Sequence, residues 1–250
     1  MRYLRELVTH LTRRELALGY QNTILGWTWP LTHQLLQLAV LVFAFSKVLN
    51  LKIENYPAFV FSGLIAWTWF STGLVTASRA ILVNRQFALR PGFPTAVLPV
   101  IAIAVPMFDA VVALPLLFVL LAVGHDLSAD VVLLPVAFAV QFVMMAGLAW
   151  LSASLSVVLR DIPNLIAVLI LMGFYVTPVY FDVGRVPEQY QWLLRLNPAT
   201  TLIEADRAIL MGGPWPTVAA LAIVTAGSFA VAAGGYLCFR RLSHSFADEL

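Results

Sequence analysis

The sequence predicts an all-α membrane protein with six transmembrane helices, and three observations lead to this fold class. Hydrophobic residues make up 61% of the chain, whereas soluble domains hold about 45–50%. Charged residues make up only 11%, against about 25% in soluble domains. The apolar residues are spread along the whole chain, in runs near the ~20 residues that a helix needs to cross the hydrocarbon. Lipid is therefore the main solvent expected for this chain.

The six predicted spans follow from these apolar runs. The first is preceded by Trp27 and opens with Trp29 and Pro30, because indole rings favour membrane interfaces and proline suits the first helical position. The third contains three prolines, which predict kinks. The spans are expected at about residues 30–49, 58–79, 95–123, 131–157, 164–181 and 216–239, within a transmembrane domain of residues 25–239.

Residues 1–24 predict an amphipathic helix ahead of the first span. No apolar core of a signal peptide follows their arginines. Such a helix lies in the plane of the headgroups, with its arginines toward anionic lipid. A helix packed on a partner protein is the alternative. The apolar side chains recur with the spacing of one helix face, at Leu4, Leu7, Val8 and Leu11.

Residues 182–214 predict a hairpin of two short helices before the last span. The second helix begins at Asn197 and Pro198, a capping residue followed by a proline, and ends at a pair of glycines. Glu204 and Arg207 stand three residues apart and could pair on one face. Helices too short to span, placed between two spans, favour a re-entrant or interfacial hairpin over a solvated loop.

The distribution of basic residues predicts that both termini are cytoplasmic. With the N-terminus inside, the inner segments hold ten lysines and arginines and the outer segments hold five. Cytoplasmic loops carry the excess of these residues in multi-pass proteins. Residues 240–250 then form a cytoplasmic tail, and the hairpin lies outside.

The inventory of reactive residues argues against a membrane enzyme. Cys238 is the only cysteine and the four histidines are scattered, so no metal site with clustered ligands is predicted. Neither of the two lysines, Lys47 and Lys52, lies in a phosphate-binding loop. ATP hydrolysis by that route therefore needs a separate polypeptide. A net charge of +2 without a basic run excludes nucleic acid as a partner.

Asp109 is the one acidic residue near the middle of a predicted span. An ionised carboxylate there costs roughly 2.5–3.5 kcal/mol, so it needs a partner, a wet cavity or a proton. Two interpretations stay open: an acid that lines a transport path or carries a proton, and a structural acid bonded to neighbouring helices. A proton-coupled carrier or a membrane enzyme that uses Asp109 is therefore one alternative function.

Four blocks of sequence carry a resemblance to a known family. They are residues 18–31 (LGYQNTILGWTWPL), residues 159–163 (LRDIP), the group formed by TPVY at 177–180, VPE at 186–188 and LNP at 196–198, and the tail at 239–250. In this order, and with this number of predicted spans, they resemble the ABC-2-type permeases of polysaccharide and O-antigen exporters. Pro30 comes directly after Trp29, earlier than the family's usual proline.

The resemblance implies a function and a set of partners. Such permeases act as homodimers, and each copy binds a separate ATPase subunit. ATP and Mg bind in that partner, so this chain is expected to bind no cofactor. Permeases of this family export lipid-linked glycans of the O-antigen, capsule or teichoic-acid type across the bacterial cytoplasmic (inner) membrane. Membrane lipids are therefore also expected partners of this chain. An ABC-2 permease for a small amphipathic drug or lipid is the alternative.

Two inner turns are expected to couple the permease to the ATPase. The loop after the second span is a short amphipathic piece with a projecting aromatic, and a solvated charged turn is its alternative. The other inner turn is either a salt-linked cap on the fifth span or a second ATPase contact. The candidate coupling residues are Asn84, Arg85, Phe87, Arg90, Arg160 and Asp161.

The outer hairpin, over residues 187–212, is expected by resemblance to frame the exit. Aromatic faces suit the C–H faces of sugar rings and let a polymer slide past. Ordinary packing or an interfacial belt is the alternative for each aromatic. The candidates for the translocation path or gate are Tyr190, Trp192, Asn197, Pro198, Glu204, Arg207, Tyr175, Tyr180, Trp67 and Asp109.

Overall fold

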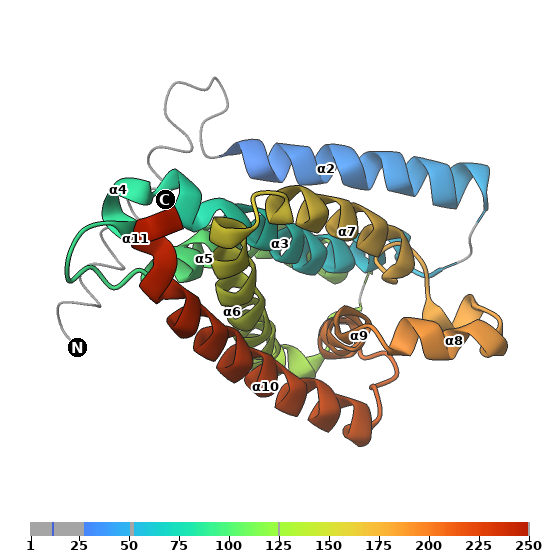
Figure 1. The fold of residues 1–250 in the computed structure, drawn as a ribbon. Coiled ribbons are helices and arrows are strands. Elements are labelled where there is room, and N and C mark those ends of the chain that lie inside the picture. The colour runs from blue at the N-terminus through green and yellow to red at the C-terminus, as the bar shows by residue number, and fades with distance from the viewer. Residues whose placement is uncertain (1–11, 13–27, 51–52, 125, 250) are drawn as a thin grey trace.

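The computed structural model describes residues 12, 28–50, 53–124 and 126–249. Within these ranges every regular element is a helix, as predicted (Figure 1). The long elements are α2 (Trp29–Leu41) with its π-helical continuation η2 (Val42–Val48), α3 (Tyr56–Val83), α5 (Val97–Gly124), α6 (Leu134–Val158), α7 (Ile162–Val176) and α10 (Val218–Leu242). The short elements are α4 (Arg85–Ala88), η3 (Ala129–Leu133), η4 (Val183–Arg185), α8 (Glu188–Arg195), α9 (Pro198–Met211), η5 (Ser243–Ser245) and α11 (Phe246–Glu249).

Five helical stretches of the described chain are long and apolar enough to cross a membrane. They cover Trp29–Val48, Tyr56–Val83, Val97–Gly124, Ala129–Val158 and Val218–Ser245, and they correspond to five of the six predicted spans. The remaining predicted span, over residues 164–181, corresponds to α7, which has 15 residues. A helix of that size is about 22 Å long at 1.5 Å per residue, whereas the hydrocarbon core is about 30 Å thick. A sixth full crossing stays a prediction.

α7 ends early because a proline follows its C-terminus. The residue before a proline is disfavoured in the helical conformation. Thr177 accordingly takes extended backbone angles, with φ of −89° and ψ of 138°. The apolar run continues past this point to Tyr180, so hydrophobicity alone predicted a longer helix.

α3 lies at the centre of the bundle and packs against α2, α5, α6, α7 and α9. In the most apolar part of α3, 72% of the window is buried inside the protein. In the corresponding part of the stretch Val218–Ser245, which contains α10, 11% is buried. Two buried polar side chains, Trp69 on α3 and Gln141 on α6, are paired with backbone carbonyls, because an unpaired polar group is costly in apolar surroundings. Trp69 Nε1 donates to the carbonyl of Ile103 at 3.0 Å, and Gln141 Nε2 donates to that of Ala66 at 2.9 Å.

α6 and α10 approach each other at their backbones. A Cβ atom added at Gly147 or at Gly235 would overlap the backbone of the other helix. Small residues allow this close approach between helices in lipid, where dispersion contacts drive association. A Cβ added at Gly227 or Gly234 meets no described atom within 4 Å, so the other face of α10 is open.

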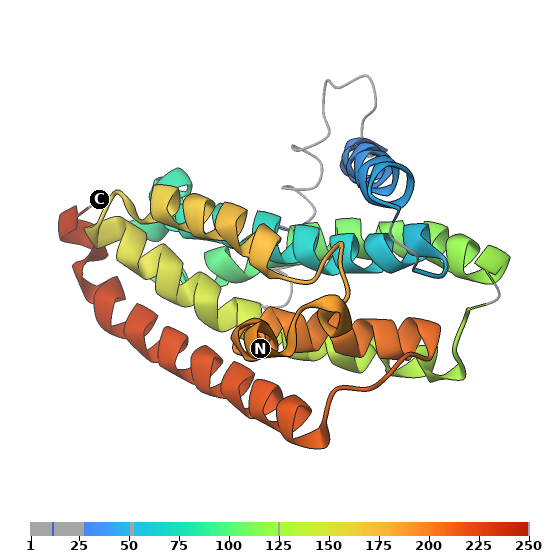
Figure 2. The same cartoon turned by 90° about the vertical axis from the view of Figure 1, so that its right-hand side faces the viewer.

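The helices place the predicted inner and outer segments at opposite ends of the molecule. α4, α11 and the C-terminus lie at one end, and α8 lies at the other (Figure 1). In the view turned by 90° the α8 side faces the viewer, and α11 and the C-terminus lie at the left, where α10 ends (Figure 2). The predicted amphipathic helix over residues 1–24 lies outside the described residues, except for residue 12.

Candidate functional site

The segment between α7 and α10 contains the two short helices that the sequence predicts, α8 and α9. Asn197 caps α9, because its Oδ1 accepts a hydrogen bond from the backbone N–H of Ala199 at 3.0 Å, and Pro198 opens the helix. Gly212 ends it with a φ of 66°, the left-handed conformation that glycine adopts at helix C-termini. Local sequence signals therefore determine both ends of α9.

Asn197 also links the hairpin to the end of α7. Its Nδ2 donates to Thr177 Oγ1 at 2.8 Å, and Thr177 is the C-cap of α7. One side chain thus starts α9 and fixes its position against the preceding apolar helix.

Arg207 makes the strongest connection of α9 to the bundle. Its side chain is buried, with 8% exposed. Nη1 donates to the carbonyl of Pro178 at 2.7 Å, and Nη2 donates to those of Val179 at 2.7 Å and Phe59 at 3.2 Å. The guanidinium carbon lies 3.5 Å from the centre of the Phe59 ring, a cation–π geometry. These contacts direct the terminal nitrogens toward carbonyls. Among the described residues no ion pair joins Arg207 to Glu204, so the predicted pairing of these two side chains is wrong.

Three α3 residues that are not among the predicted site residues lie against Arg207 or the turn that follows α7. Tyr56, Phe59 and Gly63 follow the spacing of one helix face. The Tyr56 hydroxyl donates to the carbonyl of Tyr180 at 2.8 Å. A Cβ at Gly63 would lie 2.8 Å from the carbonyl oxygen of Val179 and close to Arg207. Their spacing was visible in the sequence, but the partners on α9 and after α7 were not.

Asp206 is a second buried ionisable residue on α9, and the sequence analysis did not single it out. It is 4% exposed, and its Oδ1 has no hydrogen-bond partner among the described residues. Burial raises the pKa of its carboxyl to about 7, and Arg207 beside it acts in the opposite direction. α9 lies outside the five candidate spans. Its burial depends on packing against α3, α6 and α10, which no local pattern indicates.

Two of the predicted gate aromatics belong to a packed aromatic cluster. The ring centre of Tyr180 lies 4.9 Å from that of Phe45 and 5.6 Å from that of Phe174. Trp67 is 6.2 Å from Phe174 and is 6% exposed. The cluster joins η2, α3 and the end of α7, so the contacts of Tyr180 and Trp67 are those of packing residues.

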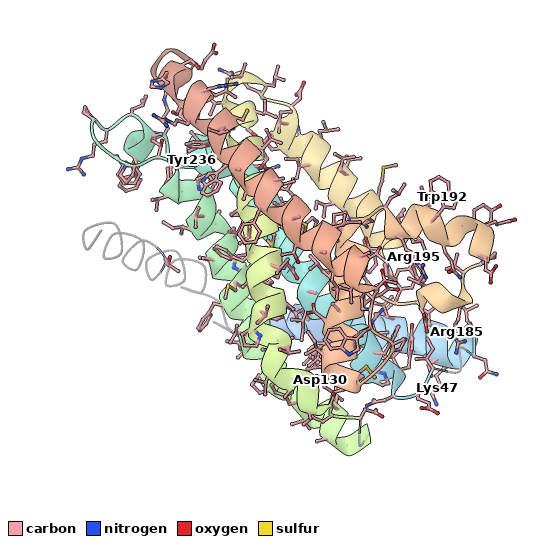
Figure 3. The ribbon with its side chains drawn as sticks, turned by 90° about the horizontal axis from the view of Figure 1, so that it is seen from below. Lys47, Asp130, Arg185, Trp192, Arg195 and Tyr236 are labelled. Atoms are coloured by element: carbon pink, nitrogen blue, oxygen red, sulfur yellow. The ribbon has the colours of Figure 1, made fainter. Side chains whose placement is uncertain are left out.

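Three other predicted aromatics are accessible. Tyr175, Tyr190 and Trp192 expose more than half of their surface, at 63%, 56% and 61%. Trp192 points away from the bundle at the edge of the molecule, on the same helix as Arg195 (Figure 3). α8 buries only Leu194. These rings lie at the α8 end and are available to a ligand or to lipid.

At the opposite end, the predicted coupling loop contains the four-residue helix α4. The Asn84 amide donates to a carbonyl in the last turn of α3 at 3.0 Å. Phe87 is half-buried, and its ring centre lies 5.5 Å from that of Phe93. The predicted projecting aromatic is therefore packed inward. Arg85 and Arg90 are the exposed charged residues of the loop.

The second inner turn joins α6 to α7, and both Arg160 and Asp161 are exposed there. The main-chain carbonyl of Asp161 accepts from the N–H of Leu165 at 3.0 Å, so it starts α7 through its backbone. In the described part of the chain no ion pair joins the two side chains. The salt-linked turn is thus not the arrangement found, and contact with another molecule stays a prediction.

Asp109 is half-buried and lines a groove of about 440 Å³ between α3 and α5. Thr72, Thr76 and Arg79 also line this groove, so the carboxyl faces polar groups as well as apolar ones. Pro106 lies in the same wall and, having no N–H, leaves the carbonyl one turn earlier without its usual helical donor. Path-lining and structural roles for Asp109 both stay open.

Long apolar helices around a central α3, with a buried polar anchor at one end and exposed arginines at the other, define a multi-pass helical membrane protein. The family model of the ABC-2 type transporter matches residues 6–211. The chain belongs to this family, which confirms the family resemblance seen in the sequence.

Curated relatives align with the chain over nearly its whole length. It is 29% identical to the O-antigen export system permease protein RfbA of Myxococcus xanthus, over 98% of this chain and 96% of the relative. It is 24% identical to the RfbA protein of Klebsiella pneumoniae, over 99% of this chain and 96% of the relative. The polysialic acid transport protein KpsM of Escherichia coli is 21% identical, over 82% of this chain and 81% of the relative.

Proposed function

We propose that this chain is the membrane-spanning permease subunit of an ATP-driven exporter of lipid-linked polysaccharide. The observation that carries the proposal is the alignment with two O-antigen export permeases over 96% of their length. The more distant relative is named for the transport of polysialic acid, a different polysaccharide. The cargo class common to these names is a polysaccharide, which favours it over a small drug or lipid.

In this function the α8 end faces the exit. The hairpin of α8 and α9 folds back into the outer leaflet, and Tyr190 and Trp192 offer accessible rings to sugar faces. α9 provides the fixed base, since Arg207 and Asn197 hold it to α3 and to the end of α7. The fixed helix α9 supports the accessible rings of α8. Such rings suit a polymer that slides past them and is not held in one bound position.

The α4 end faces the ATPase subunit. We place it in the cytoplasm of a bacterium, with both termini, and the chain in the inner membrane. A separate ATPase subunit binds ATP and Mg and docks on Arg85 and Arg90, the exposed arginines of the α4 loop. Two copies of the chain form the complex, each with its own ATPase, and the permease performs no hydrolysis itself.

Deletion of the gene in its native host tests the cargo. Surface glycan and cytoplasmic lipid-linked glycan are measured together, with the wild-type gene restored as the control. Loss of glycan outside with accumulation inside is expected. Unchanged glycan in both places, in a host without a second exporter, would overturn the polysaccharide assignment and favour a smaller cargo.

A charge reversal tests the motor contact. Arg85→Glu with Arg90→Glu should abolish co-purification of the ATPase and export, while the protein stays inserted. Arg185→Glu with Arg195→Glu is the matched control, because it reverses two arginines at the opposite end. Normal co-purification in the first variant would remove the α4 loop from the interface.

A further inference from the structure

The carboxyl of Asp206 lies inside the bundle without the partners that a buried charge requires. The residue is 4% exposed, and its Oδ1 accepts no hydrogen bond from any described group. An ionised carboxylate accepts hydrogen bonds through both oxygens, and its burial is costly unless they are satisfied. A protonated carboxyl carries no charge, so burial favours it over the ionised form. The surroundings of Asp206 therefore favour a bound proton.

Arg207, the next residue, does not supply the missing partner. Its Nη1 and Nη2 donate to the carbonyls of Pro178, Val179 and Phe59. The remaining nitrogen, Nε, is buried and has no hydrogen-bond partner in the part of the chain that the structure describes. Asp206 Oδ1 and Arg207 Nε therefore do not bind each other. Arg207 lowers the pKa of the Asp206 carboxyl, but burial raises it by more.

Among the described residues around α9, no second cation acts on Asp206. The elements that pack against α9 are α3, α6, α8, α10 and η3. α6 has no ionisable side chain, and α10 carries its ionisable residues in its last two turns, at the end of the molecule opposite to α8 (Figure 1). Arg195 on α8 acts on Glu204, a half-buried acid of α9. The other ionisable residues of these surroundings are acids and tyrosines, apart from one exposed arginine: Tyr56, Asp126, Asp130, Tyr180, Asp182, Arg185 and Glu188.

The chain on either side of α9 allows this helix to move separately from the spans. Residues 212–217, which join it to α10, form no regular element and contain two glycines and two prolines. On the other side lies α8, which buries a single residue. Hydrogen bonds hold α9 near both ends: Asn197 binds Thr177, and the carbonyl of Leu210 accepts from the N–H of Ser128 at 3.0 Å. α9 can therefore open locally when these bonds, the contacts of Arg207 and its packing are broken.

A charge on the buried side of α9 opposes its packing, because ionised groups are costly to remove from water. We infer that Asp206 is a proton-binding switch: α9 is docked in the bundle while this carboxyl holds a proton, and it loosens when the proton leaves. In the proposed orientation α9 lies on the outer side of the membrane, so the external pH sets the state of the switch. The inference goes beyond the proposed function, because it concerns how the hairpin is held, whatever the cargo.

The pH range of the switch follows from the two buried residues. Burial raises the pKa of Asp206 to about 7 and lowers the pKa of Arg207 to about 9, so Arg207 stays charged while Asp206 titrates. An aspartate in water has a pKa of about 4. Docked α9 therefore binds more protons than released α9. Docking is most stable below pH ~4, weakens as the pH rises and levels off above about pH 7.

Hydrogen–deuterium exchange of α9 tests the inference. The full-length chain is placed in phosphatidylcholine nanodiscs, and exchange of the amides of residues 198–211 is measured by mass spectrometry from pH 5 to pH 8. Each rate is divided by the intrinsic exchange rate at that pH, which removes the base catalysis of exchange itself. The opening constant of α9 should rise about tenfold from pH 5 to pH 6 and level off above pH 7. Peptides of α3 and α6 should keep their protection throughout.

Two variants assign the effect to one carboxyl. Asp206→Asn has nearly the size of the protonated residue and carries no charge, so it should remove the pH dependence and open at least about tenfold less often than the wild type at pH 8. Glu188→Gln removes a carboxyl from the exposed helix α8 and is the matched control, which should behave as the wild type. The expected result in Asp206→Asn is a gain of protection, which misfolding does not produce.

Four outcomes would overturn the inference. They are constant protection of residues 198–211 between pH 5 and pH 8, an unchanged pH dependence in Asp206→Asn, loss of the pH dependence in Glu204→Gln instead, and equal loosening of α3, which would assign the effect to the whole bundle. The proposed function stands apart from these results. If gene deletion blocks glycan export while the protection of α9 does not change with pH, only the switch is wrong.

Discussion

α8 and α9 are adjacent in sequence, yet the protein holds them in different ways. α9 is buried along most of its length and is tied to α3 and α7 by Asn197 and Arg207. α8 buries a single residue, Leu194, and exposes its aromatic rings. The comparison shows that α9 is packed into the helical bundle, whereas α8 lies on its surface. Substitutions in α9 should therefore act on stability, and those in α8 on transport.

The largest expected effect is that of Arg207→Ala. It leaves the carbonyls of Pro178 and Val179 without donors inside the protein and opens a cavity beside Phe59. Each unsatisfied buried carbonyl costs about 1–3 kcal/mol, so the two together cost about 2–6 kcal/mol. At about 2–4 °C per kcal/mol, the unfolding temperature in detergent should fall by roughly 4–24 °C. Arg195→Ala on exposed α8 is the control and should change it little. Equal unfolding temperatures in the two variants would remove the distinction between the helices.

Gly63→Ala tests the same anchor from the α3 side. The added Cβ would lie 2.8 Å from the carbonyl oxygen of Val179 and 2.9 Å from Arg207 Nη2, so these groups must shift. Overpacking of this kind costs about 1–3 kcal/mol. Thermal unfolding measures the loss, with Gly227→Ala as the matched control, because its Cβ meets no described atom within 4 Å. A control as unstable as Gly63→Ala would mean that the effect comes from the helix and not from the anchor.

Asn197→Ala should have a smaller effect. It removes the N-cap of α9, worth about 1 kcal/mol, together with the hydrogen bond to Thr177 Oγ1. Asn197→Asp keeps the cap acceptor but loses the amide donor, so comparison of the two unfolding temperatures separates these roles. If both variants match the wild type, α9 is positioned by Arg207 and by packing alone.

Trp192→Ala should have the least effect on stability and a clear effect on transport. The ring is 61% exposed, so its removal leaves no cavity. Surface glycan should fall at equal expression, with ATPase co-purification unchanged. Leu193→Ala, also exposed and on the same helix, is the control. Normal glycan in the Trp192 variant would show that this ring does not contact the cargo.

The sequence predicted those parts of the fold that depend on local signals. Apolar runs located five spans, and the Asn197-Pro198 start and glycine end located α9. The length of α7 was overestimated because the apolar run continues beyond Pro178, although the proline itself indicated the helix end. Phe87 was expected to project, but Phe93, six residues away across a turn, offers it a packing partner.

The site was harder to predict because its contacts are distant in sequence. Arg207 was counted as an outer charge, and its partner Phe59 lies 148 residues earlier. Arg79, near the end of α3, and Arg160, in the turn between α6 and α7, likewise line one open pocket of about 340 Å³, although they lie 81 positions apart in the sequence. Composition identifies which residues are charged or apolar, but tertiary packing decides which of them become neighbours.

The anchor of α9 recognises the main chain and not the side chains of its partners. All three acceptors of Arg207 are carbonyl oxygens, which every amino acid supplies. Related permeases can therefore exchange the side chain at position 179 without losing the connection, provided that the turn keeps its path. Substitutions should be tolerated at position 179 and restricted at Arg207 and Gly63. An alignment of related sequences should therefore show Arg207 and Gly63 unchanged and position 179 variable.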